Sequence, residues 1–113
     1  MKARNTLLGA TPHSVERTLR KLGADLKTAR LRRNLTRDEV AQKIGTSRYA
    51  VADAELGKPS TGVVVYAALL WTYGFIERLA DLADPSRDDE GSRLALARSP
   101  ARARHRRKLD NEF

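Results

Sequence analysis

The segment from Leu22 to Lys58 constrains the fold most, because helix signals and turn signals follow one another in it at short intervals. Apolar residues recur at helical spacing in its first part, and a second apolar series follows after Thr36. The first series is Leu22, Leu26, Ala29 and Leu31, and the second is Val40, Ala41 and Ile44. The spacing predicts two short helices joined by a brief connection.

Capping residues define the ends of the second of these helices. Thr36 precedes Glu39 by three residues, which is the spacing of a capping box: the hydroxyl accepts from a free backbone N–H while the glutamate reaches back. Gly45 supplies a left-handed residue just after Ile44. We therefore expect this helix to begin after Thr36 and to end at Ile44.

A third helix follows the glycine. Either Thr46 or Ser47 can cap its N-terminus, and its pattern continues to about Leu56. Gly57 ends it, with Pro59 beyond. The three helices are thus connected by two tight turns.

This order of elements, with the residues AQKIGTS and a glutamate before Gly-Lys, resembles the lambda-repressor-like family of helix-turn-helix regulators. The resemblance implies an all-α fold, a compact five-helix domain that binds DNA. The alternative is a generic small helical bundle without a ligand. If Val51 and Ala54 face the core, a polar cluster lies on the outer face of the third helix, where that family reads base edges.

The base-reading positions implied by the resemblance are Arg48, Tyr49 and Asp53. Arginine donates two hydrogen bonds to guanine, tyrosine can lie against a thymine methyl group, and aspartate can accept only from cytosine N4. Asp53 departs from the family's usual neutral or basic residue. It either reads a cytosine or repels nearby phosphate.

The resemblance also implies contacts with DNA phosphates and one structural ion pair. The phosphate-contact positions are Arg37, Gln42, Ser47 and Lys58. The ion pair joins Arg30 to Glu55, and the alternative is that Arg30 only adds to the positive charge facing DNA.

The flanking segments complete a division into three parts. Residues 1–13 lack sustained periodicity and are expected to form a mobile arm, residues 14–83 a DNA-binding and dimerisation domain, and residues 84–113 a short helix and a basic tail. Ser14 can cap a lead-in helix with Val15 and Leu19 on its apolar stripe, and Gly23 could break or kink it.

Two or three further helices are predicted after Pro59. A fourth spans about residues 61–73 and ends at Gly74, and a fifth carries Phe75, Ile76, Leu79 and Leu82. Asp84-Pro85 stops the fifth helix, and Ser86 with the acidic residues after it could open a short sixth.

Residues 62–91 resemble the region that follows the DNA motif in HipB-type antitoxins. The matching positions are Tyr66, Ala67, Leu70, Trp71, Gly74, Leu82, Ala83, Asp84 and Pro85. The resemblance implies an antitoxin of a type II toxin-antitoxin pair, which represses its own operon and binds a HipA-like serine/threonine kinase toxin. The alternatives are a stand-alone phage-like or housekeeping repressor, and an interaction adaptor whose DNA face is vestigial.

Two surfaces are expected to bind protein. Apolar residues beyond the needs of one small core predict a homodimer contact at Trp71, Tyr73, Phe75, Ile76 and Leu79. The tail combines acidic, basic and aromatic residues that could engage the kinase, namely Asp84, Asp88, Asp89, Glu90, Arg102, Arg106 and Phe113. Whether the tail binds toxin, DNA or neither stays open at this point.

Composition narrows the function classes. The formal charge of +8 at pH 7 favours a polyanion such as operator DNA as partner. No cysteine is present, and the two histidines, His13 and His105, lie in segments expected to be mobile, so we expect no enzyme, metal or cofactor. The longest apolar run, Val63–Trp71, is far shorter than the ~20 residues that span a bilayer. A soluble cytoplasmic protein without membrane contact is therefore expected.

Overall fold

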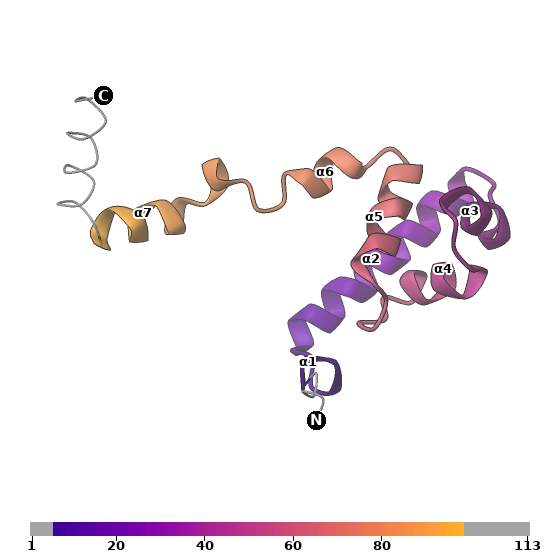
Figure 1. Cartoon of the computed structure of the whole chain (residues 1–113), viewed down its shortest axis with the longest axis horizontal. Helices are drawn as coiled ribbons and strands as arrows, with labels where there is room; N and C mark the ends of the chain where they lie inside the picture. The colour runs from indigo at the N-terminus through magenta and orange to yellow at the C-terminus, as the bar shows by residue number, and fades with distance from the viewer. Residues whose placement is uncertain (1–5, 99–113) are drawn as a thin grey trace. The chain divides into compact units, whose positions relative to one another are not determined.

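The computed structural model describes residues 6–98, and this part of the chain contains seven α-helices, one 3₁₀ helix and no strand (Figure 1). The helices are α1 (Thr6–Gly9), α2 (His13–Arg32), α3 (Arg37–Ile44), α4 (Arg48–Glu55), α5 (Val63–Thr72), α6 (Ile76–Ala80), η1 (Pro85–Arg87) and α7 (Asp89–Arg98). The predicted all-α fold is confirmed. The chain divides into two compact units, residues 1–79 and residues 80–113. None of the described helices is long and apolar enough to cross a membrane.

The N-terminal region differs from expectation at two points. A single helical turn, α1, lies inside the segment predicted as an arm. Helix α2 begins at His13 behind Pro12, so Ser14 is already inside the first turn and cannot be the N-cap. The prediction that Ser14 caps this helix is wrong, because the first helical hydrogen bonds, from Val15 N and Glu16 N, already go to Pro12 O.

Gly23 does not break or kink α2, which is continuous through it. The residue is needed for close packing: a Cβ atom at Gly23 would lie 2.5 Å from the carbonyl oxygen of Ala54 and 2.6 Å from that of Glu55. Backbone therefore packs directly on backbone where α2 meets α4. The glycine is explained by tertiary contact and not by local flexibility.

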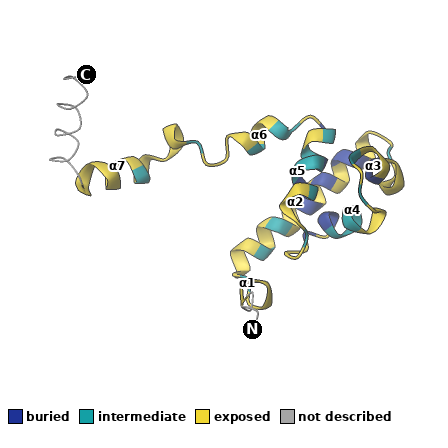
Figure 2. Cartoon of the chain, viewed as in Figure 1, coloured by how far each residue is buried: buried dark blue, intermediate teal, exposed yellow. Residues whose placement is uncertain are grey.

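The core of the first unit lies between α2, α3, α4 and α5 (Figure 2). Its buried apolar residues are Leu26, Ala29, Val40, Ala41, Val51, Ala54, Tyr66, Leu69 and Tyr73. Leu31, which the helical spacing placed with this series, is instead 57% exposed. Nine residues after Leu22 correspond to two and a half turns at ~3.6 residues per turn, so Leu31 points to the opposite side of α2.

Both predicted helix boundaries around α3 are confirmed. Thr36 and Glu39 form the reciprocal capping box, and Gly45 adopts a left-handed conformation with φ of 82°. Of the two candidate caps for α4, Ser47 is the one used, since its hydroxyl accepts from Ala50 N. The turn between α3 and α4 is thus specified by residues within it.

Helix α6 is shorter than predicted: it begins at Ile76, so Phe75 precedes it. Helix α6 ends at Ala80, so Leu82 is not on it and is exposed. Asp84 accepts from Ser86 N and caps η1, and α7 starts at Asp89. The predicted sixth helix therefore exists, but Ser86 does not open it, because this serine lies within η1.

Candidate nucleic-acid interface

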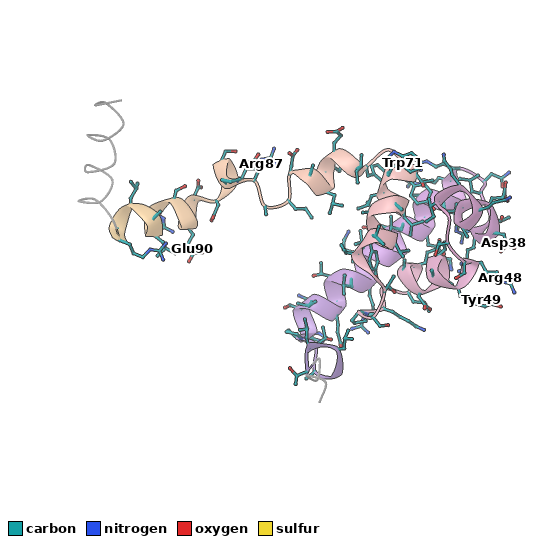
Figure 3. All side chains as sticks on the ribbon, viewed as in Figure 1. Asp38, Arg48, Tyr49, Trp71, Arg87 and Glu90 are labelled. Carbon is teal, nitrogen blue, oxygen red and sulfur yellow. The ribbon has the colours of Figure 1, made fainter. Side chains whose placement is uncertain are left out.

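Helices α3 and α4 present a polar surface opposite the core. Val51 and Ala54 are fully buried, which directs the first turn of α4 outward. Arg48 and Tyr49 lie in that turn and are exposed, Tyr49 to 67%. Figure 3 shows them beside Asp38 at one edge of the first unit, with their side chains directed away from the bundle. The two residues predicted to lead base reading are therefore accessible together.

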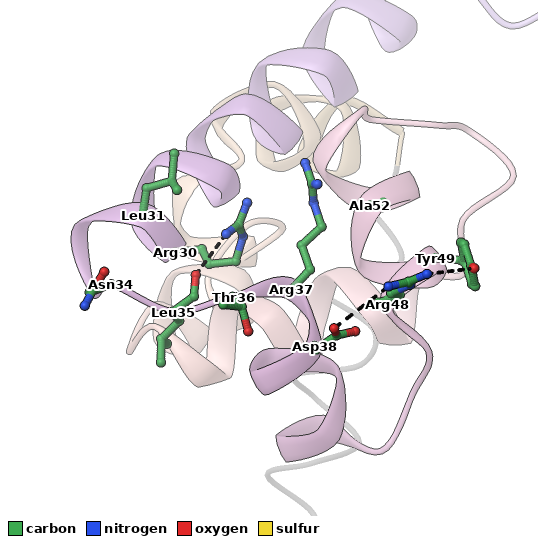
Figure 4. Close-up of a pocket in the computed structure, with 10 residues that line it drawn as sticks. All are labelled: Arg30, Leu31, Asn34, Leu35, Thr36, Arg37, Asp38, Arg48, Tyr49 and Ala52. Atoms are coloured by element: carbon green, nitrogen blue, oxygen red, sulfur yellow. Dashed lines mark hydrogen bonds and ion pairs between the residues drawn. The ribbon is translucent and has the colours of Figure 1, made fainter.

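Arg48 is held in place by two neighbours (Figure 4). Its Nη2 donates to the hydroxyl of Tyr49 at 3.2 Å, and its guanidinium lies over the Tyr49 ring, 5.1 Å from the centroid. Its Nη1 is 4.0 Å from Oδ2 of Asp38 on α3. The arginine thus stacks on an aromatic ring while facing a carboxylate of the preceding helix.

An open groove of about 610 Å³ separates the end of α2 from the starts of α3 and α4. Its charged lining residues are Arg30, Arg37, Asp38 and Arg48. Three of the four are arginines, but Arg30 and Arg37 both donate to buried Glu55, and Arg48 faces Asp38. Three arginines against two carboxylates leave a net charge of +1, which favours an anionic ligand at this edge of the unit only weakly.

Beneath the groove lies a buried ion pair with a third member. Arg30 Nε and Nη2 donate to the two carboxylate oxygens of Glu55 at 2.7 and 3.1 Å, and Arg30 Nη1 donates to Leu35 O at 2.9 Å. The hydrogen bond with Glu55 raises the pKa of Arg30 above its usual value. The pairing implied by the family resemblance is thus present, and the alternative of a DNA-facing Arg30 is excluded by its burial.

Arg37 joins this pair, which the sequence did not predict. Its Nε donates to Oε1 of Glu55 at 3.0 Å, while its side chain remains 43% exposed. The residue lies 18 positions before Glu55, so no local spacing rule could indicate the contact. Its predicted role at a phosphate therefore has to coexist with a structural bond.

Asp53 also has an internal partner. Its Oδ1 lies 3.1 Å from Nζ of Lys58, and both side chains are about half exposed. The sequence offered two roles for Asp53, reading cytosine or repelling phosphate, and neither included this pair. Lys58, predicted to contact phosphate, already has a counterion in the free protein.

The two uncharged residues predicted at phosphates are placed differently. Gln42 is exposed on α3. Ser47 uses its hydroxyl as acceptor for Ala50 N at the start of α4, so the hydroxyl serves the helix cap.

The predicted dimer residues separate into core and surface. Tyr73 is only 4% exposed and packs in the core, and burial raises its pKa. Its assignment to a dimer contact is therefore wrong, because the turn after α5 directs its ring inward. Trp71 is exposed, with Lys43 Nζ 5.6 Å from its ring centroid. Phe75, Ile76 and Leu79 are partly buried.

Phe75 has two cationic neighbours. The guanidinium of Arg33 lies 5.7 Å from its ring centroid and that of Arg78 lies 4.9 Å from it. Arg33 also donates to the backbone oxygen of Tyr73 at 3.0 Å. A partner that packs on this ring therefore also meets the positive charge that lies over it.

The acidic residues of the second unit have local structural roles. Asp84 accepts from Ser86 N and Oγ, both at 2.9 Å, and these bonds lower its pKa. Asp88 accepts from Gly91 N at 2.9 Å, and Asp89 and Glu90 occupy the first turn of α7. Arg102, Arg106 and Phe113 lie outside the described residues.

Comparison with known proteins agrees with this geometry. Residues 21–90 match a family described as helix-turn-helix domain. The match covers well over half of the chain, so the protein belongs to this helix-turn-helix family and is a DNA-binding regulator. No curated protein and no solved structure matches the chain.

Proposed function

We propose that the protein is a sequence-specific transcriptional repressor that reads its operator with Arg48 and Tyr49. The observation that carries the proposal is the pair of exposed side chains in the first turn of α4, supported from behind by fully buried Val51 and Ala54. In helix-turn-helix proteins the N-terminal part of the second helix contacts base edges in the major groove. Because Arg48 stacks on Tyr49, the two side chains would address neighbouring base pairs.

Phosphate contacts would position α4 in the major groove of the DNA. Gln42 and the free backbone N–H groups at the start of α4 offer uncharged donors, and Arg37 and Lys58 offer charged ones. These contacts orient the domain without selecting a sequence. Selection is left to the α4 side chains.

The test replaces the arginine that leads base reading. Arg48→Ala should weaken binding to a duplex selected by the parent protein by ~1 to 3 kcal/mol and relax the preference at one base. Arg20→Ala is the matched control, because Arg20 is an exposed arginine on α2 that also has one carboxylate neighbour, Glu16 at 4.0 Å. If the Arg48 variant discriminates as well as the control does, base reading by α4 is refuted.

We further propose that two copies bind half-sites about one helical turn, ~34 Å, or a multiple of it apart. The dimer contact would use the surface-accessible members of the predicted set, Trp71, Phe75, Ile76 and Leu79. Ile76→Asp or Leu79→Asp should then give monomers in sedimentation and weaker operator binding, whereas Leu82→Asp, at an exposed position beyond α6, should not. Dimers that persist in the folded Ile76 and Leu79 variants would place the contact elsewhere.

The finer role we propose is that of antitoxin in a type II pair, with a HipA-like serine/threonine kinase as toxin and its own operon as target. The resemblance of residues 62–91 to HipB-type antitoxins supports the partner. Helix α7 adds a physical reason: none of its residues is buried, and Leu94 and Leu96 are exposed on it. An exposed leucine on α7 gains apolar burial if a partner protein covers it.

The toxin proposal predicts that the neighbouring gene encodes a kinase, and it is tested by pull-down of that gene's product at matched salt. Full-length protein should recover the kinase, while a chain ending at Asp88, or the Leu94→Asp/Leu96→Asp variant, should recover less and keep operator binding. Equal recovery would remove α7 from the contact. No recovery with any form would favour the second candidate, a stand-alone repressor whose only protein partner is itself.

A further inference from the structure

The cations predicted to meet DNA are all paired with carboxylates of the same chain. Arg48 Nη1 faces Asp38 at 4.0 Å, and Lys58 Nζ faces Asp53 at 3.1 Å. The third, Arg37, is bonded to buried Glu55. A DNA phosphate that approaches either of the first two must therefore compete with an internal anion.

The two surface pairs have little to contribute to folding. The side chains of Arg48 and Asp38 are 57% and 71% exposed, and those of Lys58 and Asp53 are 51% and 42% exposed. Ion pairs with this exposure are screened by water and salt and stabilise a fold weakly. The two ion pairs have their greatest effect on binding, when a DNA phosphate approaches the cation of a pair.

Phosphate and guanine differ in what they do to the Asp38–Arg48 pair. A phosphate bound by Arg48 brings a full negative charge close to the Asp38 carboxylate, which repels it. The major-groove edge of guanine presents the neutral acceptors N7 and O6, so an arginine can donate to guanine while a carboxylate stays beside it. Asp38 therefore penalises backbone contacts more than the base contact.

The Asp53–Lys58 pair acts on the electrostatic attraction itself. Binding to random DNA depends almost entirely on cations that replace condensed counterions at phosphates. A lysine that Asp53 already neutralises displaces fewer counterions from DNA. When Lys58 leaves Asp53 for a phosphate, the Asp53 carboxylate remains beside that phosphate without its partner. Operator binding also rests on base contacts, so the Asp53–Lys58 pair removes a smaller share of the affinity for the operator than of the affinity for random DNA.

We propose that Asp38 and Asp53 are specificity-determining residues that suppress binding to the DNA backbone by occupying Arg48 and Lys58 in the free protein. The inference rests on the proposed reading of an operator by α4. It adds an electrostatic contribution to that reading. Separating the two cations from their carboxylates costs free energy, and only DNA with the correct bases offers base contacts that offset this cost. Discrimination then comes from weaker binding to wrong DNA as well as from stronger binding to the right one.

The test neutralises each carboxylate with the smallest change of shape. Asp38→Asn, Asp53→Asn and the double variant are compared with the parent on a random-sequence duplex and on a duplex that the parent selects from a random library. Asp25→Asn is the matched control: it raises the net charge equally and breaks an exposed pair, with Lys21 at 2.7 Å, on α2 away from the groove lining. Thermal melts establish that every variant is folded.

Each variant at position 38 or 53 should bind the random duplex more tightly by on the order of fivefold at low salt, the effect of one charge at ~4 Å in water. The salt slope should steepen by up to ~0.9 for Asp53→Asn. Affinity for the selected duplex should rise less, so that the ratio of the two affinities falls.

Two results would overturn the inference: unchanged random-duplex binding in the double variant, or an equal rise in Asp25→Asn, which would reveal only a net-charge effect. A parent that enriches no sequence at all would refute the proposed function instead. In that case the random-duplex measurements still decide whether the carboxylates suppress phosphate binding.

Discussion

Glu55 offers the sharpest test of how α4 is held against α2 and α3. Its side chain is only 2% exposed and accepts three hydrogen bonds, two from Arg30 and one from Arg37. Glu55→Gln keeps the shape of the side chain but removes the negative charge, which leaves the Arg30 guanidinium, 7% exposed, without a counterion. Breaking a buried pair in this way typically costs about 3–5 kcal/mol.

That loss is a large part of the ~5–15 kcal/mol by which small domains are stable. A guanidinium keeps its charge at any ordinary assay pH, so deprotonation of Arg30 does not relieve the variant. Urea denaturation followed by circular dichroism should therefore show a much lower midpoint. Arg37→Gln removes only the half-exposed member and should cost about 0–1 kcal/mol.

A double variant separates charge burial from packing. Arg30→Met with Glu55→Met removes both buried charges, and replacing an entire buried pair by apolar residues is often close to neutral. The double variant still loses some stability, because Leu35 O loses the hydrogen bond donated by Arg30 Nη1. We expect the double variant to be more stable than Glu55→Gln alone. A Glu55→Gln loss no larger than that of Arg37→Gln would refute the reasoning.

Two further predictions concern the packing and capping of the first unit. Gly23→Ala should destabilise the fold by about 1–3 kcal/mol in a denaturant melt, since its Cβ would meet Ala54 O at 2.5 Å; a gain in stability, as on an exposed helix surface, would contradict this contact. Hydrogen bonds from Thr36 lower the pKa of Glu39 below its usual 4.5, so its stabilising effect is complete above that pH and is lost as pH falls through the lowered pKa. Glu39→Gln should flatten the acid side of a plot of Tm against pH, and an unchanged acid limb would show that titration of the Glu39 carboxylate does not contribute to stability.

Local signals in the sequence were enough to define α3, the turn and α4. The Thr36–Glu39 box, Gly45 and the Ser47 cap each act within three or four residues, and the structure confirms all of them. The helical phase in which Val51 and Ala54 face the core was an assumption at the level of sequence, and both residues are fully buried. From this phase the outward position of Arg48 and Tyr49 could be inferred correctly.

The same local rules failed where a neighbouring helix decided the outcome. Gly23 could break or kink α2 by its sequence alone, and instead it admits the backbone of α4. Tyr73 was expected on the surface, yet the turn after α5 places it in the core. Leu31 is apolar like the other residues of its series, but it points to the opposite side of α2 and is exposed.

By itself, then, the sequence determined α3 and α4, their N-terminal caps, the turn between them and the face that α4 presents. Only the tertiary structure decided the partners of the charged side chains: Arg37 with Glu55, Asp38 with Arg48, and Asp53 with Lys58. Capping and periodicity operate between residues a turn apart along one helix. Long charged side chains reach across helices and loops, so their pairing depends on how α2, α3 and α4 pack, and packing is set by the whole core.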